Sequence, residues 1–163
     1  MSLAIYPGSF DPITLGHMDV VQRAAAIFDR VTVAVLQNSS KSSLFTVEER
    51  MEMIRESVDG IDGVDVSSFN GLTVEYARNV QANAIVKGLR AVSDFESEFQ
   101  QALFNRKLAP EITTVFLMTS FANVYLSSSL VKEVARFGGD VSFAVPQPVA
   151  RRLKALALKG GGE

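Results

Sequence analysis

Short apolar runs alternate with longer amphipathic segments along most of the chain. The apolar runs are bounded by turn residues and have the length of buried strands: residues 3–6, 31–36, 64–69, 84–86 and 114–118. The segments between them carry apolar residues at helical spacing and are predicted to be helices: residues 18–28, 46–58, 72–80 and 93–108. Because neighbouring parallel strands need a crossover connection, this alternation predicts an α/β fold, a doubly wound five-stranded parallel sheet with helices on both faces.

Two of the predicted helices start with a capping box, in which a side chain and the backbone amides at the helix start bond reciprocally. They are Thr46 with Glu49 and Ser93 with Glu96. In a doubly wound sheet, ligands bind beyond the carboxyl ends of the strands, where the strand order reverses. The functional residues are therefore expected in the loops that follow the strands.

The end of the chain departs from this alternation. After two glycines come a short apolar run over residues 141–145 and a basic helix over residues 149–158. A chain of 163 residues has the size of one domain. We expect residues 1–158 to form a single domain and residues 159–163 to be a flexible tail.

Composition excludes several kinds of site and partner. The net charge of -2 gives no global basic field that would gather nucleic acid. With no cysteine and one histidine, the chain can build neither a disulfide framework nor a thiolate or multi-histidine metal site. The N-terminus carries no export signal, and the apolar runs are far shorter than the ~20 residues that span a bilayer. We expect a cytoplasmic protein that binds neither nucleic acid nor a membrane.

The loop after the first predicted strand delivers the single histidine, His17, to the first turn of a helix. Free amides and the positive end of the helix dipole favour phosphate at such a place, and His17 would add a directed hydrogen-bond donor. A lone histidine there can also be a cap or a surface residue. Gly8 and Gly16 allow the backbone to approach a ligand, yet their spacing matches neither the dinucleotide-binding fingerprint nor the Walker phosphate loop.

Three separated segments resemble motifs of one superfamily. Residues 14–17 read TLGH and resemble the (H/T)xGH signature of the nucleotidylyltransferases, in its threonine form. Residues 126–132 read LSSSLVK and are similar to the ISSSxx(R/K) motif of the same superfamily, although serines at a helix start can also be plain caps. Residues 87–96, KGLRAVSDFE, look like the GLR segment of the bacterial phosphopantetheine adenylyltransferases. The likeness covers nearly the whole chain in order, since it continues through residues 105–106, 116–118 and 129–135.

This resemblance implies the Rossmann-like nucleotidylyltransferase fold and an activity. The enzyme would transfer AMP from ATP to 4′-phosphopantetheine by direct in-line displacement, forming dephospho-coenzyme A and pyrophosphate in coenzyme A biosynthesis. The attacking phosphate is already largely ionised near neutral pH, with a second pKa of about 6, so no general base is needed. Because no carboxylate cluster is dedicated to Mg²⁺, the metal is expected to be held mainly by the ATP phosphates. The resemblance also implies a homohexamer and suggests inhibition by coenzyme A.

The resemblance also implies a role for three catalytic residues. His17 would hydrogen-bond the α-phosphate and stabilise the transition state, Lys41 would bridge the nucleophile and the α-phosphate, and Arg90 would hold ATP phosphates. The ATP-binding residues would be Ser9, Phe10, His17, Gly88, Leu89, Arg90, Glu98, Asn123, Val124, Tyr125, Leu126, Ser127, Ser128 and Ser129. Those that bind phosphopantetheine would be Ser9, Lys41, Thr73, Lys87 and Asn105.

Three other functions stay open. Another nucleotidylyltransferase, acting on nicotinate mononucleotide or on a sugar or alcohol phosphate, shares the superfamily, but the GLR and SSSLVK segments argue against it. A nucleotide-binding regulator without catalysis is disfavoured because His17, Lys41 and Arg90 are all present. A dinucleotide-dependent oxidoreductase would suit the sheet but lacks the glycine fingerprint, and a fold alone does not decide function.

Overall fold

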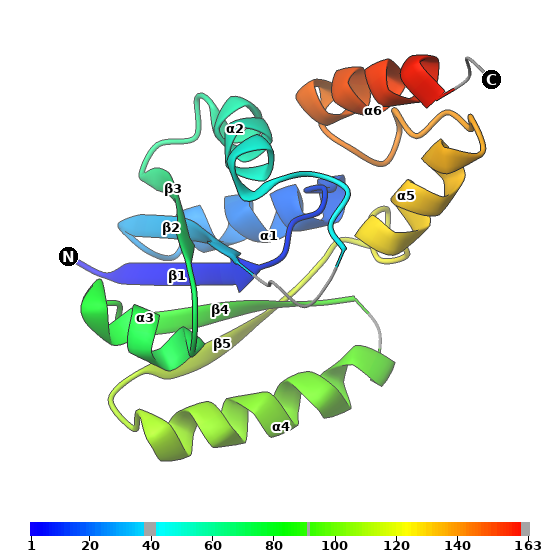
Figure 1. Ribbon diagram of the computed structural model, residues 1–163. Helices are drawn as coiled ribbons and strands as arrows, with labels where there is room; N and C mark the ends of the chain where they lie inside the picture. The colour runs from blue at the N-terminus through cyan, green and yellow to red at the C-terminus, as the bar shows by residue number, and fades with distance from the viewer. Residues whose placement is uncertain (38–41, 91, 161–163) are drawn as a thin grey trace.

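One parallel sheet organises the part of the chain that the structure, a computed structural model, describes: residues 1–37, 42–90 and 92–160, with the side chains of residues 92–94 and 158–160 left out. Its strand order is β3-β2-β1-β4-β5 (Figure 1). The strands are β1 (Leu3–Gly8), β2 (Arg30–Leu36), β3 (Val64–Phe69), β4 (Ala84–Leu89) and β5 (Thr113–Met118). All the strand pairs are parallel, so the predicted α/β fold with a doubly wound five-stranded sheet is confirmed.

Helices cover both faces of this sheet. Figure 1 shows α1 and α2 on one face and α3 and α4 on the other, with α5 and α6 packed beyond the sheet on the side of α1. Their bounds are α1 (Leu15–Ala25), α2 (Val47–Val58), α3 (Thr73–Asn79), α4 (Val92–Leu108), α5 (Ser128–Arg136) and α6 (Gln147–Gly160). None of the helices in the described ranges is long and apolar enough to cross a membrane.

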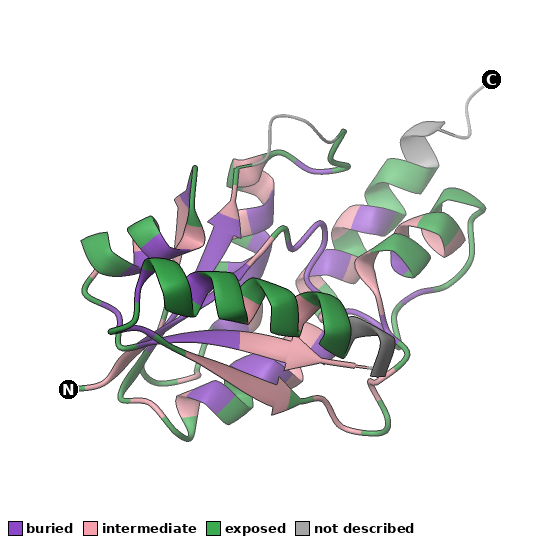
Figure 2. Ribbon diagram, turned by 90° about the horizontal axis from the view of Figure 1, so that it is seen from below, coloured by how far each residue is buried: buried purple, intermediate pink, exposed green. Residues whose placement is uncertain are grey.

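Two apolar clusters lie on the two faces of the sheet. Successive strand residues point to opposite faces, so Ala4 and Tyr6 of β1 join the cluster beneath α1 and α2, while Ile5 joins the one beneath α3. The first cluster is the larger and includes residues of α5 and α6. The sheet is therefore buried on both sides near β1, and α4 leaves much of its outer side exposed (Figure 2).

Several element boundaries differ from the sequence predictions. The fourth strand continues beyond residue 86 because residues 87–89 pair with residues 116–118 of β5, so these three residues end a strand instead of forming a loop. The first helix begins at Leu15, three residues earlier than its apolar periodicity indicates. Helix α6 likewise extends beyond the predicted range of 149–158 at both ends and includes two residues that the sequence assigns to a flexible tail.

Of the two predicted capping boxes, the one before α2 is confirmed. The Thr46 amide donates to a Glu49 carboxylate oxygen at 2.8 Å, and the Glu49 amide donates to the Thr46 hydroxyl at 3.2 Å. The other does not sit as predicted, since α4 begins at Val92 and Ser93 lies inside the helix, with its side chain outside the described part. Sequence patterns define the exact end of a helix only to within one or two residues.

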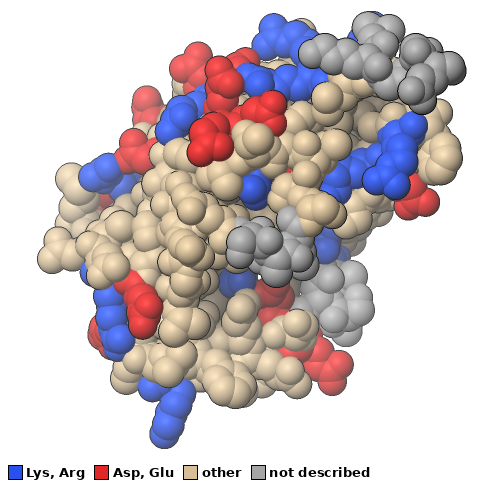
Figure 3. Space-filling model, in the orientation of Figure 1, with Lys and Arg blue, Asp and Glu red and all other residues tan. Residues whose placement is uncertain are grey.

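Ion pairs tie the last helix to α2. Arg152 of α6 lies 2.7 Å from a carboxylate oxygen of Glu52 and 3.4 Å from one of Glu56. Figure 3 shows acidic and basic side chains gathered over these two helices. These ion pairs hold α6 beside α2, and α6 also packs against α5.

The turn before β3 depends on a glycine. Gly63 has φ +74°, and a Cβ atom there would lie 2.7 Å from the backbone oxygen of Asp29. Gly60 has φ +84°, but a Cβ atom there would meet nothing within 4 Å, so it is a matched control. We expect Gly60→Ala to lower the free energy of unfolding by ~1–2 kcal/mol and Gly63→Ala by ~1–3 kcal/mol more, measured by urea denaturation. Equal losses for the two variants would contradict the steric argument.

Candidate active site

A cavity of about 280 Å³ opens at the carboxyl ends of β1 and β4, where the strand order reverses. Figure 1 shows both strands running toward the start of α5. Five segments line the cavity, namely the end of β1 with the following loop and α1, the end of β4, one side of α4, the residue that follows β5, and the start of α5. The lining residues are Tyr6, Pro7, Gly8, Phe10, Thr14, Gly16, His17, Val20, Lys87, Gly88, Arg90, Glu98, Thr119, Ser127, Ser128 and Ser129.

His17 is both a helix cap and part of the cavity wall. Thr14 is the N-cap of α1: its side chain accepts from the His17 amide at 3.3 Å, and its own amide donates to Nδ1 of His17 at 3.0 Å. Because Nδ1 accepts a backbone N–H, the neutral ring carries its proton on Nε2. The cap therefore fixes the tautomer that leaves Nε2–H free to donate.

The surroundings of His17 also fix its charge. Burial, and then repulsion by the Arg90 guanidinium, lower the pKa of His17 to about 4 from an ordinary value of 6.5. The imidazole is therefore neutral near pH 7. The neutral ring can therefore donate a hydrogen bond from Nε2, while Arg90 supplies the positive charge beside it.

Two aromatic rings hold the imidazole in place. Phe10 meets His17 edge-on with 5.1 Å between ring centroids and Tyr6 edge-on at 5.2 Å. Phe10 has φ 47°, a conformation that bulky residues rarely adopt, and is 3% exposed. Such backbone strain persists only where packing enforces it, and it clusters at functional sites. Burial raises the pKa of the Tyr6 hydroxyl, so Tyr6 is not a base near neutral pH.

The end of β4 forms the floor of the cavity. A Cβ atom on Gly88 would lie 2.9 Å from a methyl carbon of Val20 and 3.3 Å from the Tyr6 hydroxyl oxygen. Only glycine leaves both side chains where they are, which gives a physical reason for the glycine of the GLR segment. The backbone of β4 can then approach a ligand closely.

Arg90 and the start of α5 form the opposite wall. The guanidinium of Arg90 donates to the backbone oxygen of Leu126 at 3.0 Å. Ser127 is the N-cap of α5 and accepts from the Leu130 amide at 3.1 Å, so the capping interpretation of this serine holds. Ser128 donates to the backbone oxygen of Pro12 at 2.7 Å. The wall thus combines a cation with the amide-rich start of a helix, which favours phosphate.

On the other side, Lys87 contacts α4. Its ammonium group lies 3.2 Å from a carboxylate oxygen of Glu98 and donates to Oε1 of Gln101 at 2.8 Å. Glu98 therefore faces the cavity beside Lys87 instead of forming a surface pair. Lys87 and Arg90 thus place two positive charges in the lining of the cavity. The Glu98 carboxylate lies beside them, between β4 and α4.

The structure gathers many of the residues that the sequence proposes, but not all of them. Phe10, His17, Lys87, Gly88, Arg90, Glu98 and Ser127 to Ser129 line one cavity. Lys41 lies outside the described residues. Those that do not line the cavity are Ser9, Thr73, Leu89, Asn105, Asn123, Val124, Tyr125 and Leu126.

The predicted site residues outside the cavity lining have varied surroundings. The Ser9 backbone oxygen accepts from the buried Arg50 at 2.7 Å. The Leu126 side chain is buried in the apolar core, so only its backbone oxygen faces Arg90. Asn105 is 8% exposed, and its amide nitrogen has no hydrogen-bond partner within the described residues. Thr73 is the first residue of α3, and Tyr125 is mostly exposed.

Sequence reasoning gave no role to four cavity residues, Tyr6, Pro7, Val20 and Thr119. Tyr6 and Val20 match the apolar patterns of a strand and a helix, so no signal separates them from the core. Thr119 directly follows β5, and its position beyond a strand end is the one available hint. The described residues contain no group of three or more His, Cys, Asp or Glu side chains that could hold a metal ion.

Comparisons with known proteins identify the family. The cytidylyltransferase-like family model matches residues 5–134. The chain is 58% identical over 153 residues to the phosphopantetheine adenylyltransferase of Caldanaerobacter subterraneus subsp. tengcongensis, covering 94% of this chain and 96% of the relative. It is 55% identical over 163 residues to that of Desulforudis audaxviator, covering 99% of this chain and 100% of the relative. The chain belongs to the phosphopantetheine adenylyltransferase family.

A solved structure supports the fold. A protein from Vibrio parahaemolyticus described as a nicotinate-nucleotide adenylyltransferase superposes with a TM-score of 0.71 at 18% identity, covering 94% of this chain and 99% of that one. At this identity the match shows the Rossmann-like fold alone. The resemblance of the sequence to the phosphopantetheine adenylyltransferase family is confirmed by the family model and by the curated relatives.

The depressed pKa of His17 predicts a pH dependence of stability. In the unfolded chain the imidazole binds a proton below about pH 6.5, whereas in the folded chain it does so only near pH 4. The unfolded state therefore binds more protons between these values, and stability falls as pH drops through this window. We expect this group to lower the free energy of unfolding by roughly 2–3 kcal/mol between pH 6.5 and pH 4.

The measurement compares chemical denaturation of the wild type and His17→Gln across that pH range. The carboxylates with lowered pKa act in both proteins, so their contribution cancels in the difference. Parallel pH curves for the two proteins would show that His17 is protonated at its ordinary pH in the folded state.

Proposed function

We propose that this chain catalyses the transfer of AMP from ATP to 4′-phosphopantetheine, producing dephospho-coenzyme A and pyrophosphate in coenzyme A biosynthesis. The observation that carries the proposal is the meeting of His17, Arg90 and the serines that start α5 in one cavity. The chain is 55–59% identical to relatives named phosphopantetheine adenylyltransferase, each matched over more than nine-tenths of its length. The site and the family thus agree on phosphoryl chemistry.

The reaction needs positioning and charge stabilisation more than proton transfer. The phosphate nucleophile is ionised near neutral pH, since its second pKa is about 6. It attacks the α-phosphorus in line, the bond to the bridging oxygen breaks, and pyrophosphate leaves with the electron pair. The Nε2–H of His17 donates to an α-phosphate oxygen as charge grows on it. The neutral ring already carries this proton because Nδ1 accepts from the Thr14 amide, so the donor does not depend on protonation of the imidazole.

The two ends of ATP would bind on different walls. Arg90, the Gly88 and Leu89 backbone and the start of α5 hold the outer phosphates, with Glu98 and residues 123–129 beside the nucleotide. The first loop, with Ser9 and Phe10, contacts both ligands. Lys87 binds the phosphate of phosphopantetheine, whose remaining length runs along Thr73 and Asn105. Lys41, which lies outside the described residues, would bridge the two reacting phosphates.

Mg²⁺ is expected to enter with ATP. Among the described residues, the cavity lining offers one carboxylate, that of Glu98, which lies against Lys87. It also offers the hydroxyl groups of Tyr6, Thr14, Thr119, Ser127, Ser128 and Ser129. That donor set fits a cation whose ligands are mainly ATP phosphates and water. When bound, the ion would neutralise charge on the outer phosphates.

The test follows pyrophosphate release from ATP and Mg²⁺ with phosphopantetheine, and with nicotinate mononucleotide as a parallel acceptor. We expect release only with phosphopantetheine, and a ~10²- to 10³-fold loss of kcat in His17→Ala because one transition-state donor is removed. Release with nicotinate mononucleotide instead would favour another nucleotidylyltransferase. ATP binding without release with either acceptor would favour a regulator, and an unchanged kcat in His17→Ala would exclude its role.

The proposed assembly is a homohexamer in the cytoplasm, with coenzyme A as an inhibitor and no nucleic acid partner. Its support in the structure is a run of exposed apolar side chains along α4: Phe95, Phe99, Leu103, Phe104 and Leu108. Figure 2 shows this helix lying across its face of the sheet with its outer side uncovered. A second copy of the chain would bury these side chains.

Substitution on α4 tests the assembly. Phe104 is 72% exposed in the single chain, and we expect Phe104→Ser to reduce the mass measured by analytical ultracentrifugation to that of smaller species. Phe137, at the end of α5, is 83% exposed and serves as the matched control. A monomeric wild type, or an equal effect of Phe137→Ser, would refute association through α4.

A further inference from the structure

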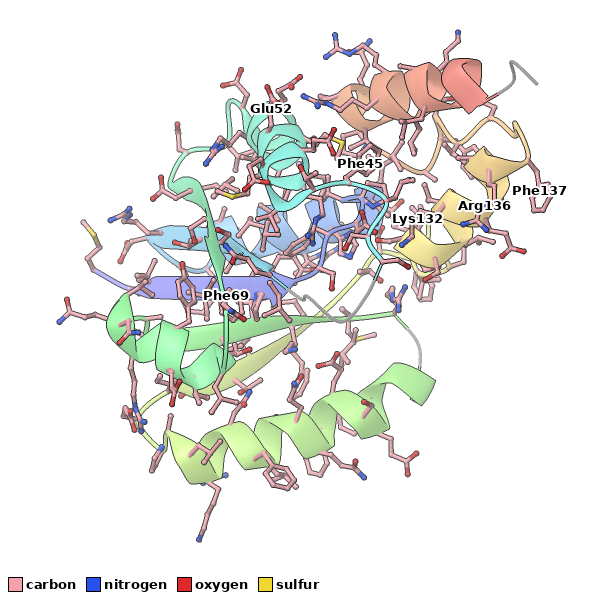
Figure 4. The ribbon with its side chains drawn as sticks, in the orientation of Figure 1. Phe45, Glu52, Phe69, Lys132, Arg136 and Phe137 are labelled. Carbon is pink, nitrogen blue, oxygen red and sulfur yellow. The ribbon has the colours of Figure 1, made fainter. Side chains whose placement is uncertain are left out.

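Asp11 joins three segments that are far apart in the sequence. It is 6% exposed, and its carboxylate accepts from the backbone amides of Leu44 and Phe45, both at 2.9 Å. The ammonium group of Lys132, on α5, donates to the same carboxylate at 2.9 Å. Figure 4 shows Lys132 on the side of α5 that faces the segment carrying Phe45. One buried carboxylate thus connects the loop after β1, the segment before α2, and α5.

A second bond lies beside the first. The hydroxyl of Ser128 donates to the backbone oxygen of Pro12 at 2.7 Å. Ser128 and Lys132 are four residues apart and therefore share one face of α5, while Asp11 and Pro12 are adjacent. Helix α5 is fixed at two points to the loop that leads into His17. The two walls of the cavity are held together by this pair of contacts.

The ion pair is charged under working conditions. Burial disfavours the ionised carboxylate, but the hydrogen bonds from the Leu44 amide, the Lys132 ammonium and the Phe45 amide outweigh it and lower the pKa of Asp11. Lys132 ends the segment LSSSLVK, yet it does not line the cavity around His17, whereas Lys87 and Arg90 do. Its charge is directed at a carboxylate and away from the place where phosphates would bind.

We propose that Asp11 and Lys132 are positioning residues, which set the start of α5 against His17 so that both can act on one triphosphate. The proposal rests on the proposed function, because a ligand must span both walls. The geometric requirement is strict, since a misplacement of about 1 Å at such a site can cost ~10²-fold in rate. Neither residue needs to touch ATP for this effect.

The experiment compares four proteins: the wild type, Asp11→Asn, Lys132→Met and the double variant. The double variant has the net charge of the wild type, so a purely electrostatic effect on ATP would cancel in it. We expect each single variant to lose ~10- to 100-fold in kcat. We expect the double variant to lose no more than either one alone, because the first change already breaks the contact between Asp11 and Lys132.

Binding gives a second readout that needs no acceptor. Positioning predicts that ATP dissociation constants rise by a similar ~3- to 10-fold in all three variants, because each of them breaks the same contact between the two walls. If Lys132 instead contacts phosphate directly, Asp11→Asn frees it and ATP binds as well as before or more tightly. That result, or a double variant restored to wild-type behaviour, overturns the proposal.

Controls separate positioning from simple stability. Lys154→Met removes an exposed lysine of α6 and should leave kcat unchanged. Lys132→Arg keeps a cation beside Asp11 and should retain most of the activity. Its comparison with Lys132→Met tests the proposal if the variants with Asp11→Asn are too unstable to assay. Lowered melting temperatures with unchanged kcat and ATP affinity would show a structural role only. A wild type that binds ATP but releases no pyrophosphate refutes the proposed function, and the ATP dissociation constants then decide the positioning role on their own.

Discussion

The position of β1 between β2 and β4 is the constraint on which the rest of the structure depends. The chain leaves β1 toward one face of the sheet and leaves β4 toward the other, so the loops beyond these two strands diverge. The crevice between them receives the start of α1 from one side and the start of α5 from the other. Every charged group of the cavity reaches it from an element whose place this strand order determines. The same order buries both faces of β1, which gives the site a rigid base.

Within that crevice, helix capping and burial set the tautomer and the charge of His17. The bond from the Thr14 amide to Nδ1 of His17 satisfies a free amide at the start of α1 and leaves the proton on Nε2. Burial and Arg90 then keep the ring neutral, and Phe10 and Tyr6 limit its movement. A site prepared in this way needs no base when the nucleophile is already ionised. The buried carboxylate of Asp11 adds the long-range connection that relates this wall to α5.

The sequence predicted what depends on local pattern and missed what depends on distant partners. The strand over residues 64–69 and the cap at Thr46 follow from periodicity and neighbours within one turn, and both were confirmed. The end of β4 was missed because Lys87 and Gly88 have the composition of a loop, and only their pairing with β5 makes them a strand. The contact of Asp11 with Lys132 spans 121 residues and leaves no trace in either segment. The motif residues were found through resemblance, whereas Tyr6 and Val20 are indistinguishable from core residues in the sequence.

The central claim is that the fold presents a neutral His17 with its proton on Nε2. The chain contains one histidine, so ¹⁵N NMR of the imidazole reports on this residue without assignment by mutation. At pH 7 the account predicts an unprotonated Nδ1 that couples to the Thr14 amide and a protonated Nε2. A doubly protonated ring would contradict the neutral state, and a single proton on Nδ1 would leave Nε2 without a hydrogen to donate. Either result would also break the bond from the Thr14 amide to Nδ1.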